Sequence, residues 1–526
     1  MKSEKVHTFW MLVLLAVCFR LVLTQKVDLW QSETLWLQRS AFDLAGSPLF
    51  CLLIRGWSRI SHNEIWLRSL SCLFSVASVA MIYLLARRTF KGPGSIETGA
   101  LAAFSPILCT AAWEVHPGSA EVFAAALWLF AFMHVLERRR GSLPLVLHGL
   151  AALVAMAFNV MLVLFALVQL VILLIYRFKE RGVILRWFAT VVAAGLLIVV
   201  FAFLSGDPVE TVPWEAEPPA RSPGSCDVSY LVTDISLGQL HAWRPLTPVF
   251  SLAPPVSEDP AVRERAIGSG VSSQVHWFFQ GLQFMFLSSF VFAVILACLS
   301  LWKIRTWPLP VSVKRRALIE KVHNSAREAG SVLVLAFILP ILYCSLTSVD
   351  LLQPFPERRL LFVIAPFLVL AGKGLKRFEW IVIRYSMVLI LAIVSFLYTY
   401  SSTGLQETTH GIADVMAAIE TDWHDGDALA ADTFLLGPAA WYSSIDVAGV
   451  SEVMGDTQRL WVIEFAPPEG SVKEGVGDFL AHEGWPSRRF GGAEESFIYR
   501  PFSKETSNVK RHLFPNYQVT LYPRTR

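Results

Sequence analysis

The stretch EIWLRSLSCLFSVASVAMIYLLA, residues 64–86, decides the fold class of this chain. It holds no charged residue after Arg68, and about 20 apolar residues in a helix are enough to cross the hydrocarbon layer of a bilayer. Arg87 and Arg88 follow directly. Of the 526 residues of the chain, 54% are hydrophobic and 17% are charged, against about 45–50% and about 25% in soluble domains. The sequence therefore predicts an integral membrane protein built mostly of α-helices.

Apolar segments of this kind recur along the chain, and we interpret about 11 of them as transmembrane helices. The stretch 143–176 is too long for one span, so we divide it into two short helices with Asn159 at the turn between them. The first segment follows Lys2 and Lys5 but lacks a convincing cleavage site, so we expect it to be retained as a helix. The predicted spans are 8–25, 64–86, 97–113, 118–136, 143–157, 160–176, 184–204, 275–302, 331–348, 359–375 and 380–400.

Positive charges gather on every second connection between these spans. The positive-inside rule places connections rich in Lys and Arg in the cytoplasm. We therefore predict a multi-pass protein of the cell membrane with a cytoplasmic N-terminus and an extracytoplasmic C-terminal part. The basic clusters are Arg87, Arg88 and Lys91; Arg138, Arg139 and Arg140; Arg177, Lys179 and Arg181; the basic residues between Lys303 and Arg327; and Lys373, Lys376 and Arg377.

Two domains are expected from a change of character near residue 400. Residues 1–400 form the transmembrane domain, and residues 401–526 form a small extracytoplasmic α/β domain. The basic stretch after residue 503 is expected to be loose. The supporting features are long outer loops at 26–63 and 205–274, an amphipathic interfacial helix at 48–57, helical spacing at 408–420 and 474–482, and strand-like runs at 428–436, 460–465 and 496–499, the last of which is expected to be the final strand.

Carboxylates gather at the predicted outer face of the membrane. Asp28 and Glu33 lie in the first outer loop, and Glu114 ends the third span. An unpaired charge in an apolar neighbourhood is costly. Glu114 is therefore expected either to pair with Arg68 or Arg20 or to take part in acceptor binding.

An ordered series of motifs resembles the GT-C fold glycosyltransferases, and more narrowly the family 39 mannosyltransferase-like group. That group often carries an LWxDE motif after the first helix, where this chain has Ser32 in place of the Asp and keeps Glu33. In the third-helix motif, His116 and Gly118 replace an Arg and a Tyr. The matching segments are Leu29 to Glu33, Ser47 to Trp57, Glu64 to Ser71, Ala103 to Pro106, Trp113 to His116, Arg358 to Leu361 with Pro366, and Asp425 to Asp427.

The resemblance implies transfer of a sugar from a polyprenyl-phosphate donor to a glycan, lipid or protein acceptor at the outer membrane face. Inverting transfer needs a general base for the acceptor hydroxyl, and the leaving lipid phosphate needs donors, for which the guanidinium group is well shaped. The roles implied are Glu33, then Asp28, as the base; Glu114, His116 and Ser32 in substrate binding; and Arg358, Arg359 and Arg68 at the donor phosphate.

Two other functions stay open at this point. Because Ser32 replaces an acidic residue, the alternative is a non-catalytic GT-C-like partner in envelope polysaccharide assembly. A transporter would need charged residues deep within its spans, for which Asn159 and Gln169 are weak support. The sequence shows no glycine-rich phosphate loop, nucleotide motif or metal-ligand spacing. We therefore expect no cofactor, no metal-ligating residues and no nucleic-acid partner, and membrane lipids as partners.

Overall fold

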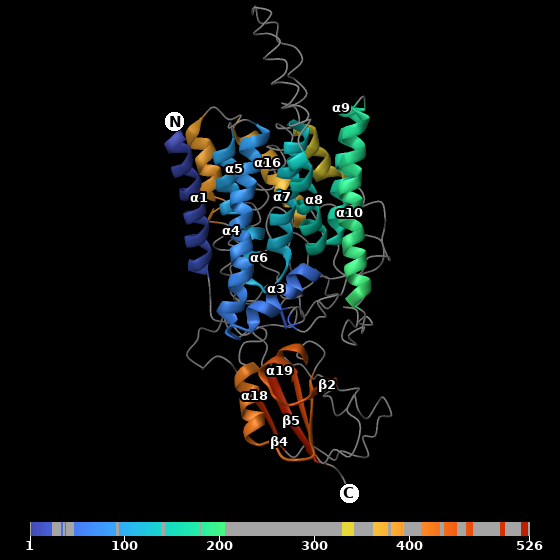
Figure 1. Cartoon of the computed structure of the whole chain (residues 1–526). Helices are drawn as coiled ribbons and strands as arrows, with labels where there is room; N and C mark the ends of the chain where they lie inside the picture. The colour runs from blue at the N-terminus through green and yellow to red at the C-terminus, as the bar shows by residue number, and fades with distance from the viewer. Residues whose placement is uncertain are drawn as a thin grey trace, which may run out of the picture.

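The computed structural model contains a helical bundle and a smaller α/β unit (Figure 1). The N-terminus lies at the end of the bundle that is remote from the α/β unit. The residues that the structure describes are 2–23, 33, 34, 37, 47–90, 94–137, 142–178, 180–205, 329–340, 361–376, 380–390, 392–393, 412–431, 436–449, 459–465, 495–499 and 517–523. The predicted span 275–302 and the predicted helix 474–482 lie outside them.

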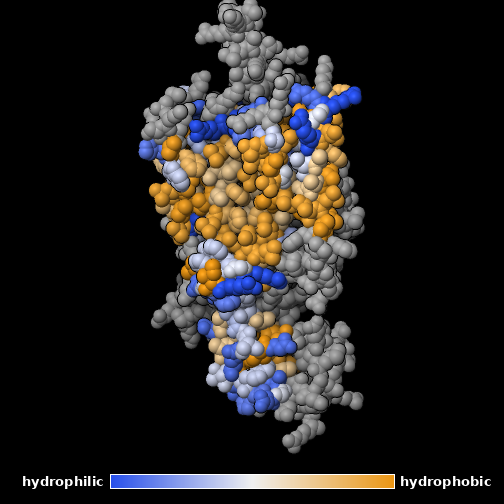
Figure 2. Space-filling view, viewed as in Figure 1, coloured by the Kyte–Doolittle hydropathy of each residue, from blue (hydrophilic) through white to orange (hydrophobic). Residues whose placement is uncertain are grey.

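The bundle forms an apolar belt bordered by polar side chains, as Figure 2 shows. Within the described residues, four helices are long and apolar enough to cross a membrane, or five if one bent pair counts as a single span. The prediction of a mostly helical membrane protein is therefore confirmed, whereas the number of spans stays a prediction. The helices are α1 (Lys2–Leu23), α3 (Pro48–Ser58), α4 (Glu64–Thr89), α5 (Ser95–Ala103), α6 (Pro106–Trp113), α7 (Gly118–Glu137), α8 (Ser142–Phe158), α9 (Val163–Arg177), α10 (Arg181–Ser205) and α16 (Ile364–Leu375), with shorter apolar helices at Ala329–Pro340 and Ile381–Ile390.

The bent pair is α5 and α6, which meet at an angle of 44°. Pro106 opens α6, and a proline is well tolerated only in the first turn of a helix. Arg20 of α1 is 1% exposed and donates to the carbonyl oxygen of Ala103 at 3.1 Å and to Ser75 Oγ at 2.7 Å. Arg20 therefore binds a carbonyl at the end of α5, where the helix leaves such groups without an internal partner.

The predicted turn at Asn159 is present. The side chain of Asn159 accepts from the amide of Met161 at 2.8 Å, at the start of a 3₁₀ turn, Val160–Leu162. His148 and Gln169 lie at nearly equal distances along the chain on either side of this turn, and their side chains are 2.7 Å apart. Because such contacts need antiparallel neighbours, α8 and α9 form a hairpin, and the division of 143–176 into two helices is confirmed.

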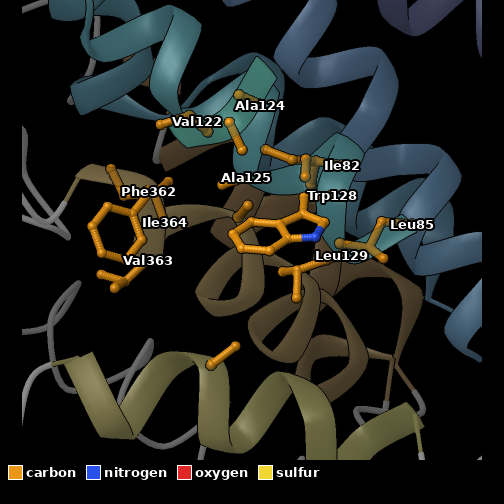
Figure 3. Packing of buried hydrophobic residues seen from close by; sticks show 14 of the residues in the cluster. Ile82, Leu85, Val122, Ala124, Ala125, Trp128, Leu129, Phe362, Val363 and Ile364 are labelled. Atoms are coloured by element: carbon orange, nitrogen blue, oxygen red, sulfur yellow. The ribbon is translucent and has the colours of Figure 1, made fainter. Parts of the chain in front are cut away.

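The core of the bundle surrounds α7. Trp128 of α7 is fully buried. A 3₁₀ turn, η4 (Leu361–Val363), and the start of α16 pack beside α7, and Figure 3 shows Phe362, Val363 and Ile364 grouped on one side of Trp128. A Cβ atom on Gly118 would lie 2.5 Å from Leu361 Cδ1, so a larger residue there would require the Leu361 side chain to move.

The α/β unit holds a five-stranded sheet in the order β2-β1-β3-β5-β4. The strand β1 pairs in parallel with β2 and β3, while β5 runs antiparallel to β3 and β4. The turn before β1 uses Gly426 at φ 90°, a left-handed conformation that glycine adopts readily. The elements are α18 (Ile412–Thr421), β1 (Asp427–Ala431), α19 (Leu436–Tyr442), β2 (Val447–Gly449), β3 (Arg459–Phe465), β4 (Glu495–Tyr499) and β5 (Tyr517–Pro523).

The sequence prediction for the end of the chain is wrong. Residues after 503 were expected to be loose and 496–499 to be the final strand, but β5 (Tyr517–Pro523) follows and lies between β3 and β4. Val519 and Leu521 are buried at alternate positions. Alternation of this kind is typical of a half-buried strand, and the basic residues around it concealed the pattern.

Asp427, the first residue of β1, joins two parallel strands at their start. It accepts from Arg459 Nε at 2.8 Å, Arg459 Nη2 at 2.7 Å and Trp461 Nε1 at 3.1 Å, and also from the amide of His424. Burial disfavours its charge, but these hydrogen bonds outweigh the burial and hold the pKa of Asp427 below its usual value. The charged carboxylate therefore stabilises the pairing of β1 with β3.

Candidate functional site

Buried acidic side chains collect where the bundle faces the α/β unit. Glu33, Glu114 and Glu121 are 0%, 1% and 4% exposed. Arg68 of α4 and His116 of the turn before α7 lie with them and are also buried. We call these five residues the acidic cluster. Charged groups in membrane-embedded structure are costly and mark functional sites by default, which makes this cluster the candidate site.

Glu33 and Arg68 form a two-pronged ion pair. Arg68 Nε donates to Glu33 Oε1 at 2.9 Å, and Arg68 Nη2 donates to Glu33 Oε2 at 2.7 Å. The amide of Val115 also donates to Glu33 Oε1, at 2.9 Å. Both carboxylate oxygens therefore accept hydrogen bonds, which is how a buried charge is made tolerable. The sequence predicted separate roles for these residues, and the structure brings them together as partners.

The turn that follows α6 is held at several atoms. Ser71 Oγ donates to the carbonyl oxygen of His116 at 3.2 Å. The amide of Gly118 donates to His116 Nδ1 at 2.9 Å. Because Nδ1 accepts this bond, it carries no proton, and the ring proton is assigned to Nε2. His116 therefore has a fixed tautomer.

Glu114 directly precedes this turn at the end of α6, and Glu121 lies in the first turn of α7. Ser47 Oγ lies 3.4 Å from Glu121 Oε1, so the start of α3 also reaches the cluster. Sequence analysis did not single out Glu121. A carboxylate within the predicted span 118–136 was the available signal, because such residues are rare in apolar spans.

The other predicted site residues, Asp28, Ser32, Arg358 and Arg359, lie outside the described residues. The described chain resumes at Leu361, which contacts the Gly118 position beside His116.

An elbow formed by residues 47–71 supports the cluster. The indole rings of Trp57 and Trp66 stack with centroids 4.6 Å apart and an interplanar angle of 5°. Each indole N–H donates to the other residue's carbonyl oxygen, at 2.9 and 3.0 Å. Asn63 caps α4 by accepting from the amides of Ile65 and Trp66. The elbow therefore fixes α3 against α4, and it reaches the cluster through Ser47 at one end and Arg68 at the other.

Among the described residues, no group of three or more His, Cys, Asp or Glu side chains could hold a metal ion. A buried carboxylate of the acidic cluster could accept a proton from a bound hydroxyl group, and the histidine could donate one hydrogen bond.

Residues 45–205 match the sequence family described as dolichyl-phosphate-mannose-protein mannosyltransferase. The match runs from just before α3 to the end of α10 and includes Arg68, Glu114, His116 and Glu121. Over this segment it confirms the resemblance to the mannosyltransferase-like group that the motifs predict. No curated protein matches the chain.

Several solved structures are similar to the chain in overall course. ArnT from Cupriavidus metallidurans in the apo state has 13% identity and a TM-score of 0.47, over 99% of this chain and 98% of that chain. The same protein bound to undecaprenyl phosphate has 12% identity and a TM-score of 0.47, over 97% of each chain. The archaeal oligosaccharyltransferase AglB from Archaeoglobus fulgidus, in complex with an inhibitory peptide and a dolichol-phosphate, has 10% identity and a TM-score of 0.45, over 95% of this chain and 73% of that chain.

Proposed function

We propose that this chain is a membrane glycosyltransferase that transfers a sugar from a polyprenyl-phosphate donor to a glycan, lipid or protein acceptor. The observation that carries the proposal is the acidic cluster, because its buried carboxylates and histidine lie mostly within the segment that matches the mannosyltransferase family. The finer topology belongs to the same proposal: about 11 spans, a cytoplasmic N-terminus and an extracytoplasmic α/β domain, which would place the cluster at the outer face.

The reaction is an inverting displacement. The acceptor hydroxyl attacks the anomeric carbon, the bond from that carbon to the phosphate oxygen breaks, the polyprenyl phosphate leaves with the electron pair, and a carboxylate takes the hydroxyl proton. The sequence predicts Glu33 as this base. Since both Glu33 oxygens accept N–H groups, an acceptor hydroxyl would have to compete with Arg68 and Val115 for them.

We assign the base to Glu114, which is buried at the end of α6 within the segment that matches the mannosyltransferase family, and a positioning role to Glu33. Glu33 binds the amide of Val115, the residue next to Glu114, and so holds the turn that carries the base. Asp28 is the second candidate for the base. His116 would donate from Nε2 to the acceptor or to the leaving phosphate, and Ser32 would bind the acceptor beside Glu33.

The donor phosphate needs positive charge. Arg68 is already paired with Glu33, so its charge is largely compensated within the cluster. Arg358 and Arg359 are the better candidates in sequence terms, since a guanidinium fork matches phosphate geometry. Their link to the cluster is Leu361, which contacts the Gly118 position beside His116. No metal or cofactor is invoked in this reaction.

The test uses purified protein in lipid nanodiscs with polyprenyl-phosphate sugars as donors. Glu114→Gln is expected to lower the transfer rate about 10²- to 10⁴-fold, the usual contribution of a general base, with an unchanged unfolding temperature. Glu137→Gln, at the exposed pair with Arg88, is the matched control and should leave the transfer rate unchanged. A wild-type protein that transfers none of a set of common donor sugars, together with cells whose glycans are unchanged by Glu114→Gln, would refute the proposal.

One observation favours the non-catalytic alternative, in which the chain is a partner in envelope polysaccharide assembly. The Glu33–Arg68 pair is buried and bidentate, an arrangement that also serves a purely structural purpose. In that case the wild-type protein would show no transfer, while Glu33→Gln would still lower its stability.

A further inference from the structure

The α/β unit contacts the bundle at His62 and Glu64 of the elbow. Tyr442, the last residue of α19, donates from its hydroxyl to Glu64 Oε1 at 3.2 Å. The ring of the preceding residue, Trp441, lies 5.6 Å from the ring of His62. Tyr442 packs against the apolar cores of both the bundle and the α/β unit. The two parts of the chain therefore meet through an aromatic pair and one hydrogen bond to a carboxylate.

Glu64 is placed to compete for the arginine of the acidic cluster. It opens α4, four residues before Arg68. Residues four apart lie on the same face of a helix, and a Glu before an Arg at this spacing is the favourable order for an ion pair. Tyr442 and Glu64 are both within electrostatic reach of Arg68. Two carboxylates, Glu33 and Glu64, thus compete for one guanidinium group.

The described arrangement settles this competition in favour of Glu33. Arg68 makes two short hydrogen bonds to Glu33. The Glu64 carboxylate faces the α/β unit and accepts from the Tyr442 hydroxyl. A phenol that holds one oxygen of Glu64 lowers the tendency of that carboxylate to turn toward Arg68.

We propose that Tyr442 is a positioning residue that assigns Arg68 to Glu33 by binding Glu64. The inference rests on the proposed transfer reaction, which it deepens: docking of the α/β unit on the elbow would set the geometry of the acidic cluster. When Tyr442 no longer binds Glu64, Glu64 can compete for Arg68 within α4. This competition weakens the hold of Arg68 on Glu33, and with it the order that Glu33 gives to the turn at Val115.

A mutant cycle with rescue tests this exchange. Tyr442→Phe keeps the ring and removes only the hydroxyl, and we expect the transfer rate to fall about tenfold, the effect of one hydrogen bond to a charged group. Glu64→Gln alone should keep the rate within about twofold, since it removes the competitor. The double variant Tyr442→Phe/Glu64→Gln should recover to within about twofold of wild type. A double variant as slow as Tyr442→Phe would overturn the proposal, because loss of a merely structural contact is not repaired by removing Glu64.

A second readout does not depend on transfer. Glu33→Gln is introduced into wild type and into Tyr442→Phe, and the unfolding temperature is measured in detergent. If Tyr442 assigns Arg68 to Glu33, the drop caused by Glu33→Gln should be measurably smaller in the Tyr442→Phe background, where Glu64 competes for Arg68. Equal drops in the two backgrounds would overturn the inference. This measurement separates a failure of the inference from an absence of glycosyltransferase activity.

Discussion

Replacing Glu33 by glutamine should lower the stability of the bundle more than the same replacement in an exposed ion pair does. Glu33 is fully buried and receives three N–H groups, two from Arg68 and one from Val115. The glutamine amide keeps the shape of the carboxylate, but its nitrogen is a donor. At least one N–H group of Arg68 or Val115 would then face this donor in place of an acceptor oxygen. Removing one partner of a buried ion pair costs about 3–5 kcal/mol, because the other charge stays buried.

The chain offers a matched comparison for this change. Arg88 Nη2 and Glu137 Oε2 are 2.6 Å apart, as close as the Arg68–Glu33 pair, but their side chains are 22% and 43% exposed. Glu137→Gln should cost at most about 1 kcal/mol, since water screens and replaces an exposed pair. The distances are alike, so the difference between the two variants measures the effect of burial.

Denaturant and thermal unfolding in detergent, followed by tryptophan fluorescence, measure both variants. A separate cycle compares Glu33→Met and Arg68→Met with the double variant Glu33→Met/Arg68→Met. The double variant should cost clearly less than the sum of these two single changes, because apolar groups can replace a buried pair. The reasoning is refuted if Glu33→Gln costs no more than Glu137→Gln. It is also refuted if the double variant costs the full sum of the single ones.

Three further predictions concern packing and the α/β unit. The pKa of Asp427 is held below its usual value, so its charge stabilises the fold fully above the ordinary carboxyl pKa. This stability is lost as the pH falls through the lowered pKa. Asp427→Asn should remove that acid sensitivity in unfolding curves taken between neutral and acidic pH. In Gly372→Ala the new Cβ would lie 2.7 Å from Thr98 Cα, and overpacking of this kind costs about 1–3 kcal/mol of folding stability. A Cβ on Gly56 has no atom within 4 Å, so Gly56→Ala should not destabilise the protein. The thermal unfolding temperatures of the two variants measure this difference. At φ 90°, Gly426→Ala should cost about 1–2 kcal/mol, and an unchanged unfolding midpoint would contradict this.

Most helices of the bundle can be predicted from hydropathy. Apolar length alone located helices such as α4 and α7, and the polar residue Asn159 located a hairpin that length could not place. Local patterns suffice here because each helix satisfies its own backbone groups. The strand β5 shows the opposite case, since its alternation at Val519 and Leu521 becomes meaningful only once its neighbours in the sheet are known.

The sequence named four of the five residues of the acidic cluster but not the contacts between them, and the roles of these residues stay predictions. Glu33, Glu114, His116 and Arg68 were all singled out, and the structure places them in one cluster. The Glu33–Arg68 pair joins residues 35 positions apart, and its existence depends on how the segment that carries Glu33 packs against α4. Residue types and spacing do not contain that information, so two residues with separate predicted tasks turned out to bind each other.

The position of β5 has a consequence for biogenesis. Chains are synthesised from the N-terminus, and β4 has β5 as its described neighbour in the sheet, while β3 needs β5 on one of its sides. Until residues 517–523 are made, β3 and β4 present unpaired edges to whatever surrounds the nascent chain. A premature stop before Tyr517 would therefore leave a protein whose helices can insert normally but whose α/β unit exposes unpaired strand edges, which chaperones and proteases recognise.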